Sequence, residues 1–290
     1  MGTVVRQRMQ AVLPLSTAND DFGDSGEDRW LPYPVAERIL AHMQEMLDVP
    51  QSDRPPGMLV YGQTNNGKTT VARRFQRLVN AQARRGKEGD EMPVVYVQTP
   101  PGPDVGHACA LLLRAVGAAV PATATRQRRV EQVTAVLPKV GARMLIFDEI
   151  HNILTGASGD TMYFLNFLKF ISNELRLPIV TVGTDEARVA MQTDQQIGNR
   201  FTPMQMPPWR VDREFALFAI QVFRGERLDG SDLFRNTEAV RKLHAQTAGL
   251  TGEVRAFARK VAARAVDPGH KLAISDLNVP GWMSPDGRRR

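Results

Sequence analysis

Apolar and polar positions along the chain predict buried strands separated by helices. Short, largely apolar runs bounded by turn residues or charges are typical of buried strands, and we expect strands at 58–61, 93–99, 143–149, 178–184 and about 202–206. Between such runs, apolar residues recur at helical spacing, as Val71, Phe75 and Leu78 do. Strands that alternate with helices indicate an α/β fold, a three-layer αβα core around a mainly parallel sheet.

The pattern changes after residue 211. From there we expect helices alone, at about 212–223, 232–247 and 252–266, which form a small all-helical C-terminal lid. These changes in residue pattern divide the chain into four parts. They are an N-terminal extension (1–34), an α/β domain (35–209), the lid (210–266) and a flexible basic tail (267–290).

Composition and charge limit the cellular environment and the kinds of partner that we expect. The single cysteine, Cys109, lies in an apolar helical run, which favours a packing residue and a reducing cytoplasm. No run approaches the ~20 apolar residues of a membrane span, and no secretory signal is visible at the N-terminus, so no membrane partner is expected. The net charge of +6 and the pI near 9.8 fit either a polyanion partner or solvated helix faces.

One glycine-rich segment follows the first predicted strand. Gly62, four intervening residues, Gly67, Lys68 and Thr69 have the spacing of a phosphate-binding loop between a strand and a helix. Such a loop wraps backbone N–H groups around phosphates, while Lys68 reaches the β- and γ-phosphates and the Thr69 hydroxyl ligates Mg²⁺. We therefore predict that ATP and Mg²⁺ bind here, with contacts from Gly62, Gln63, Thr64, Asn65, Asn66, Gly67, Lys68, Thr69 and Thr70.

An acidic pair ends the third predicted strand. Asp148 and Glu149 follow the apolar run Met144 to Phe147, at the strand end where open α/β sheets place their ligands. Phosphoanhydride hydrolysis needs a carboxylate in the Mg²⁺ shell and a base for the attacking water. We assign the first role to Asp148 and the second to Glu149, which predicts an ATPase that forms ADP and phosphate.

Three further residues are candidates for the same chemistry. Thr184 ends the fourth strand, where a hydroxyl can orient the water. Arg200 precedes the last strand and can act as a finger in a neighbouring subunit's site. Arg255 opens the last lid helix and would face the phosphates, so that the lid's position reports the nucleotide state.

Together these motifs resemble those of AAA+ ATPases. In chain order, the phosphate loop, Asp148-Glu149, Thr184, Asn199-Arg200 and Gly252-x-x-Arg255 are similar to Walker A, Walker B, sensor 1, the arginine finger and sensor 2. The segments YGQTNNGKTT, LIFDEIHNIL and VGTDEARVAMQTDQQIGNRF are similar to the transposition ATPases TniB and TnsC, with MuB more distant.

The resemblance implies a cytoplasmic, nucleoid-associated bacterial protein that selects targets for DNA transposition. Such a protein assembles with ATP into a ring or filament on double-stranded DNA. It recruits a DDE transposase and a TniQ-like targeting protein, and hydrolysis remodels or releases the assembly. If the protein assembles on DNA in this way, the candidates for DNA phosphate contacts are Arg126, Arg128 and Arg129.

Two alternatives share the nucleotide motifs. A AAA+ helicase loader or replication initiator would differ in the partner that it loads. An initiator usually carries a C-terminal DNA-binding domain, for which the short tail leaves no room. An ATP-switch signalling scaffold would bind ATP with little turnover, against which Glu149 argues. The sequence does not support a GTPase, because no Asn-Lys-x-Asp or Thr-Lys-x-Asp signature, which would recognise the guanine base, follows the third strand.

Overall fold

The computed structural model describes residues 30–288 except 51, 86–89, 193–194, 266 and 268. It forms two compact units. The α/β unit comprises Arg38–Thr64 and Lys68–Met206, and the helical unit takes its described residues from 30–37, 65–67 and 207–288. Most of the expected N-terminal extension, up to residue 29, lies outside the described residues.

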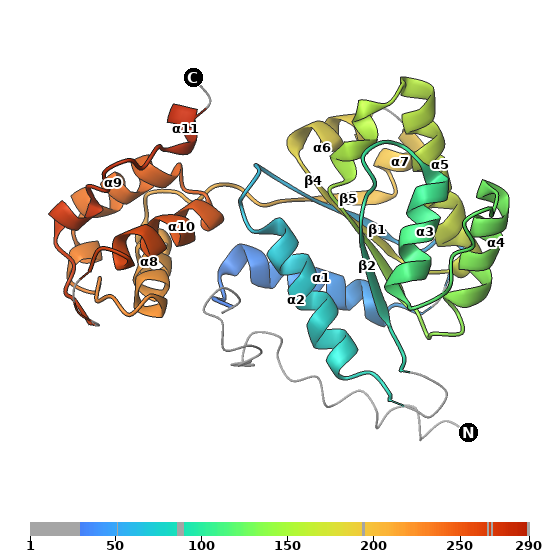
Figure 1. Cartoon of the computed structure of the whole chain (residues 1–290), viewed down its shortest axis with the longest axis horizontal. Coiled ribbons are helices and arrows are strands. Elements are labelled where there is room, and N and C mark those ends of the chain that lie inside the picture. The colour runs from blue at the N-terminus through green and yellow to red at the C-terminus, as the bar shows by residue number, and fades with distance from the viewer. Residues whose placement is uncertain are drawn as a thin grey trace. The chain divides into compact units, whose positions relative to one another are not determined.

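The described residues of the α/β unit form a five-stranded sheet (Figure 1). Its strands are β1 (Gly57–Tyr61), β2 (Val94–Gln98), β3 (Met144–Asp148), β4 (Ile179–Gly183) and β5 (Phe201–Gln205), in the spatial order β2-β3-β4-β1-β5. Every neighbouring pair is parallel. The predicted α/β class and its parallel sheet are therefore confirmed.

Helices cover both faces of this sheet. Figure 1 shows α2 on one side and α3, α4 and α5 on the other. The helices of this part of the chain are α1 (Pro34–Asp48), α2 (Lys68–Ala81), α3 (Val105–Ala115), α4 (Arg126–Val136), α5 (Ser158–Leu175), α6 (Asp185–Gln192) and α7 (Gln195–Gly198), and a 3₁₀ helix, η2, spans Ile150–Thr155. Side-chain caps start two of them, because Asp104 accepts from the His107 N–H and Thr125 from the Arg128 N–H.

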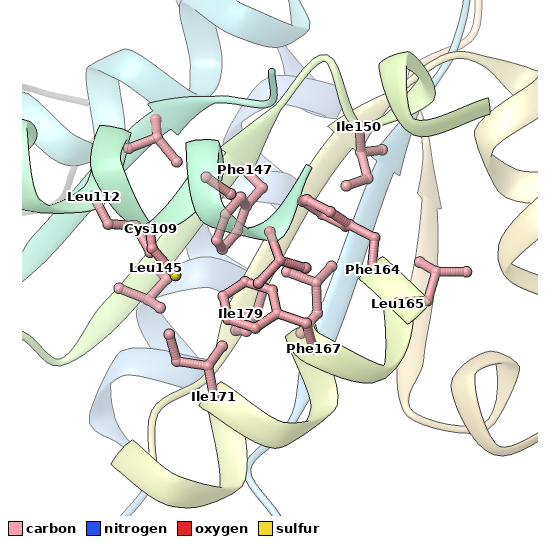
Figure 2. Packing of buried hydrophobic residues seen from close by; sticks show 14 of the residues in the cluster. Cys109, Leu112, Leu145, Phe147, Ile150, Phe164, Leu165, Phe167, Ile171 and Ile179 are labelled. Carbon is pink, nitrogen blue, oxygen red and sulfur yellow. The ribbon is translucent and has the colours of Figure 1, made fainter. Parts of the chain in front are cut away.

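The core between the sheet and α3 and α5 is apolar and closely packed (Figure 2). Phe147 of β3 meets Phe164 of α5 edge to face, with ring centroids 6.5 Å apart. Cys109 of α3 is fully buried in the same core, and burial raises the pKa of its thiol to about 12. It is therefore a packing residue, as the sequence predicts.

The helical unit contains the lid. Its elements are α8 (Arg213–Gly225), α9 (Thr237–Thr247), α10 (Thr251–Ala262) and α11 (Pro285–Arg288), with 3₁₀ helices η3 (Leu233–Arg235) and η4 (Ile274–Leu277). The single helix expected over 232–247 is interrupted at Asn236, whose side chain caps α9 by accepting from the Glu238 N–H. No helix in the described part of the chain combines the length and apolarity needed to cross a membrane.

The structure differs from the expected loose tail after residue 266. Leu277 is fully buried, and Trp282 packs edge-on against Phe257 of α10 with ring centroids 5.1 Å apart. The Trp282 indole N–H also donates to the Gln246 carbonyl oxygen at 2.8 Å. These anchors are spaced irregularly among prolines and glycines, so no helical or strand period reveals them in the sequence.

Candidate nucleotide-binding site

The carboxyl edge of the sheet gathers the main predicted site residues of the α/β unit. Gly62 follows β1, Glu149 follows β3, and Thr184 follows β4, which lies between those two strands. Because all the strands run in the same direction, these positions share one edge, where open α/β sheets bind their ligands. The structure thus brings the start of the phosphate loop, Asp148, Glu149 and Thr184 to one edge.

The turn after β1 has room for backbone alone. Gly62 adopts a φ of +156°, and a Cβ there would overlap the Met206 carbonyl oxygen. Met206 is fixed in turn, because its N–H donates to the Tyr61 carbonyl oxygen at 2.7 Å. Any side chain at Gly62 would therefore displace β5 or the loop.

Lys68 begins α2 and folds back over the loop. Its ammonium donates to the carbonyl oxygens of Gly62 at 2.9 Å and Gln63 at 2.7 Å. Burial lowers the pKa of Lys68, while the nearby charges of Glu149, Asp148 and Asp185 oppose that shift. The ammonium is thus held over the loop, close to acidic groups, where it can pair with a phosphate.

Asp148 presents a buried carboxylate at the end of β3. Oδ1 accepts from the Glu149 N–H at 2.8 Å, and Oδ2 accepts from the Tyr96 hydroxyl at 2.5 Å. Mg²⁺ prefers oxygen ligands and usually shares one or two carboxylates with substrate phosphates. The carboxylate of Asp148 and the hydroxyl of Thr69 supply such oxygens. The described residues contain no cluster of three or more His, Cys, Asp and Glu that could cage a metal alone.

Glu149 is held in an unusual backbone conformation. Its φ of +55° lies in the left-handed region, which costs a non-glycine residue energy and occurs at functional sites. Its Oε2 lies 3.1 Å from Nε2 of His151, and both side chains are partly exposed. The carboxylate is therefore accessible to water and restrained by a histidine two positions further along the chain.

The tip of the phosphate loop, Asn65–Gly67, belongs to the helical unit. The Asn65 carbonyl oxygen accepts from the Gly252 N–H at 2.9 Å, and Oδ1 of Asn66 accepts from the Thr251 N–H at 3.2 Å. A Cβ at Gly252 would overlap Asn65. The first turn of α10 and the loop tip are thus in direct contact, and this turn leads to Arg255.

Arg255 is half-buried on α10, and its charge acts on Tyr33. Burial raises the pKa of Tyr33 to about 12, and a hydrogen bond to Thr251 and the charge of Arg255 partly offset that rise. Tyr33, Thr251 and Arg255 therefore form one cluster in the helical unit. The structure brings Arg255 into the same unit as Asn65, Asn66 and Gly67.

Glu253 is a partner of the loop that the sequence does not single out. Its Oε1 accepts from the Asn65 side-chain amide at 2.8 Å, and its other oxygen pairs with Arg288 of α11. The Glu253 carboxylate is buried, so this pairing with Arg288 compensates a buried charge. No spacing rule links residues 65, 253 and 288, which meet only because the tail packs on the lid.

Arg200 lies apart from the other predicted site residues. It precedes β5, and its carbonyl oxygen accepts from the N–H of Gly57 at the start of β1, so it occupies the amino-terminal edge of the sheet. Its guanidinium donates to the Ser172 hydroxyl and the Asn173 side-chain oxygen, both at 2.8 Å. Within the α/β unit, Arg200 is thus at the edge opposite Lys68 and Glu149.

The three predicted DNA-contacting arginines differ in their surroundings. Arg126 and Arg128 are exposed at the start of α4, and the Arg126 guanidinium lies 5.4 Å from the ring centre of Tyr163. Arg129 is half-buried and donates to the Gly106 carbonyl oxygen of α3 at 3.3 Å. Arg129 is therefore engaged in joining α3 to α4, whereas the other two face solvent.

Comparison with known proteins identifies the family. The model of the family described as "Bacterial TniB protein" matches residues 24–211. The chain belongs to the TniB family. None of the curated proteins matches the sequence. The family assignment predicted from the phosphate loop, the acidic pair and the segments around them is confirmed.

Solved structures show the same fold. ORC1 of Aeropyrum pernix, in complex with DNA, is 19% identical with a TM-score of 0.62, over 92% of this chain and 67% of that chain. ORC2 of the same organism, as ADPNP-ADP complexes, is 15% identical with a TM-score of 0.57, over 84% of this chain and 64% of that one. Cdc6p of Pyrobaculum aerophilum is 15% identical with a TM-score of 0.53, over 81% and 62%. This TniB protein therefore has the AAA+ fold and spans about two thirds of these chains' lengths.

Proposed function

We propose that this TniB protein binds Mg²⁺–ATP at the carboxyl edge of its sheet and hydrolyses it. The observation that carries the proposal is the grouping of a phosphate loop, a buried carboxylate and an accessible second carboxylate at one sheet edge. The solved ORC2 structure with a similar fold holds ADPNP and ADP, which supports a nucleotide ligand.

Each residue has a defined part in this chemistry. The Lys68 ammonium exchanges its two carbonyl acceptors for phosphate oxygens and offsets their charge. Asp148 and Thr69 would hold Mg²⁺, which would neutralise charge that develops on the phosphates. Glu149 accepts a proton from the attacking water, and Thr184, one strand away, orients that water. Arg255 contacts the phosphates from the lid and reports their presence.

We further propose that the nucleotide controls assembly on duplex DNA during transposition. Membership of the TniB family supports this role, and the solved ORC1 complex shows that a protein of this fold binds DNA. The partners would be a DDE transposase and a TniQ-like targeting protein in the bacterial cytoplasm.

ATP hydrolysis by this protein is tested by measuring phosphate release from Mg²⁺–ATP by the purified protein, with and without duplex DNA. Absence of turnover in both conditions would refute it.

Arg200 is expected to act in a neighbouring subunit. It occupies the sheet edge opposite Lys68, so its guanidinium can serve another copy's site once it leaves Ser172 and Asn173. Arg200→Ala should lower ATP turnover by about 10³-fold or more in an assembly, as loss of an arginine finger does. Mixing Arg200→Ala with Glu149→Gln should restore some turnover, because Glu149→Gln still binds ATP and carries Arg200, while Arg200→Ala keeps an intact Glu149.

The mixing experiment has a matched control. Arg176→Ala removes an exposed arginine that pairs with Asp53, and it should leave turnover unchanged. If the mixture of Arg200→Ala and Glu149→Gln is as inactive as either variant alone, the trans role of Arg200 is wrong.

Arg126 and Arg128 are expected to bind DNA phosphates. Removing both in Arg126→Ala/Arg128→Ala should reduce the slope of log K against log salt by about 1.8, since each phosphate contact contributes roughly 0.9. Fluorescence anisotropy with a labelled duplex at several salt concentrations measures that slope. Arg235→Ala/Arg241→Ala, which removes two exposed arginines of the helical unit, is the charge-matched control. An unchanged slope in the double variant would remove these arginines from the interface.

A second candidate function is loading of a replication helicase, in the manner of an initiator. The ORC and Cdc6 folds among the solved structures favour it. The two functions share ATP and DNA and differ in the partner protein. Pull-down with purified transposase or replicative helicase on ATP-loaded DNA assemblies separates them, because each candidate predicts retention of one partner and not the other.

A further inference from the structure

A tyrosine on the edge strand of the sheet contacts the carboxylate of Asp148. Tyr96 of β2 lies opposite Ile146 of β3 in the strand register. Side chains alternate between the two faces of a strand, so Ile146 and Asp148 share a face, and Tyr96 shares it with them. The Tyr96 side chain is 9% exposed, and its hydroxyl donates to Oδ2 of Asp148 at 2.5 Å.

An arginine of α2, the helix that begins at Lys68, contacts the ring of Tyr96. The Arg73 guanidinium of α2 lies 4.3 Å from the centre of the Tyr96 ring, within the range of a cation–π contact. The Tyr96 hydroxyl is the donor in its hydrogen bond with Asp148, because an ionised carboxylate can only accept. Arg73, Tyr96 and Asp148 therefore form one connected row from α2 to β3.

The row restricts how the carboxylate can turn. The terminal torsion of an aspartate is broad, so a carboxylate without fixed partners samples many orientations. At Asp148 the backbone N–H of Glu149 occupies one oxygen and the Tyr96 hydroxyl occupies the other. A carboxylate has about four lone-pair sites, so both oxygens keep acceptor capacity, in an orientation that the two donors set.

We propose that Tyr96 is a positioning residue for Mg²⁺, whose hydroxyl orients the Asp148 carboxylate toward the metal that accompanies ATP. The inference rests on the proposed Mg²⁺–ATP function of this edge and adds to it a residue that no nucleotide motif contains. Residues that orient metal ligands usually change metal affinity by about 10- to 100-fold when they are removed. A hydroxyl that only satisfies a buried carboxylate would change stability and leave metal affinity intact.

Tyr96→Phe separates the two roles, because it removes the hydroxyl and keeps the ring that Arg73 contacts. Mn²⁺ serves as the probe, and its binding to the protein–ATP complex is followed by electron paramagnetic resonance. We expect Tyr96→Phe to weaken Mn²⁺ binding by roughly tenfold or more, with metal-free binding of a fluorescent ATP analogue unchanged. ATP turnover should recover toward the wild-type kcat as Mg²⁺ is raised.

Three further variants serve as a control, as a second test of the row and as a test of the metal site itself. Tyr163→Phe removes an exposed hydroxyl on α5 and should bind Mn²⁺ like the wild type. Arg73→Met changes an exposed residue, so it tests the row even if Tyr96→Phe does not fold; it should weaken Mn²⁺ binding by about two- to fivefold. Asp148→Asn tests the metal site itself and should bind Mn²⁺ far more weakly than either.

The outcomes distinguish this inference from the function on which it rests. Wild-type Mn²⁺ affinity in folded Tyr96→Phe would overturn the positioning role while leaving the metal site in place. If Tyr96→Phe does not fold, wild-type affinity in Arg73→Met would overturn it. Wild-type affinity in Asp148→Asn would instead overturn the proposed Mg²⁺ site.

Discussion

Lys68→Ala is expected to weaken ATP binding by about 10- to 150-fold, because a hydrogen bond to a charged group contributes roughly 1.5–3 kcal/mol. In the structure its ammonium already lies over the loop, held by the carbonyl oxygens of Gly62 and Gln63. Isothermal titration calorimetry with ATP measures the loss directly.

The control for Lys68→Ala is Lys169→Ala. Lys169 lies on α5, where its ammonium donates to the Gln196 side chain at 3.1 Å. Lys169→Ala should bind ATP like the wild type, and both variants should keep the wild-type thermal midpoint within a few degrees. Normal ATP affinity in Lys68→Ala would mean that the phosphate loop is assigned to the wrong segment.

Glu149→Gln should bind ATP and fail to hydrolyse it. General-base catalysis contributes about 10²- to 10⁴-fold, and the amide cannot accept the water's proton, so turnover should fall by that factor. ATP affinity should stay near the wild-type value, because Lys68, Thr69 and Asp148 remain. A coupled phosphate-release assay gives the rate, and trapped nucleotide measured after desalting gives the occupancy.

Two controls interpret the Glu149→Gln result. Glu174→Gln removes an exposed carboxylate on α5 and should hydrolyse ATP normally. His151→Gln alters the group that contacts the Glu149 carboxylate and tests whether that contact affects the base. Turnover at the wild-type rate in Glu149→Gln would exclude Glu149 as the base.

The strands and the two nucleotide motifs can be predicted from the sequence, because each of them consists of residues that are contiguous in the chain. Strands β1 to β4 are short, mainly apolar runs, and the helices between them favour parallel order, whereas β5 is more polar and partly exposed. The glycines at 62 and 67 and the pair at 148 and 149 each imply their own geometry through local backbone chemistry. The structure adds the reason for Gly62, which is the carbonyl oxygen of Met206 beside it.

Contacts between distant residues are what the sequence does not reveal. Tyr96 meets Asp148 only because β2 and β3 pair in one register, and nothing in the apolar run around Tyr96 marks it as different from a core residue. Glu253 and Arg288 meet because Trp282 and Leu277 anchor the tail, whose irregular spacing predicts a loose segment. Arg129 has the charge expected of a DNA contact, yet its guanidinium joins α4 to α3.

Sedimentation of the purified protein with double-stranded DNA tests whether ATP drives its assembly on DNA. The experiment is run without nucleotide and with ADP, ATP or a non-hydrolysable ATP analogue. We predict large DNA-bound species with ATP and the analogue, and their absence with ADP or without nucleotide. Lys68→Ala should form none in any condition. A monomer that ignores DNA in every nucleotide state would contradict ATP-dependent assembly on DNA as the function of this TniB protein.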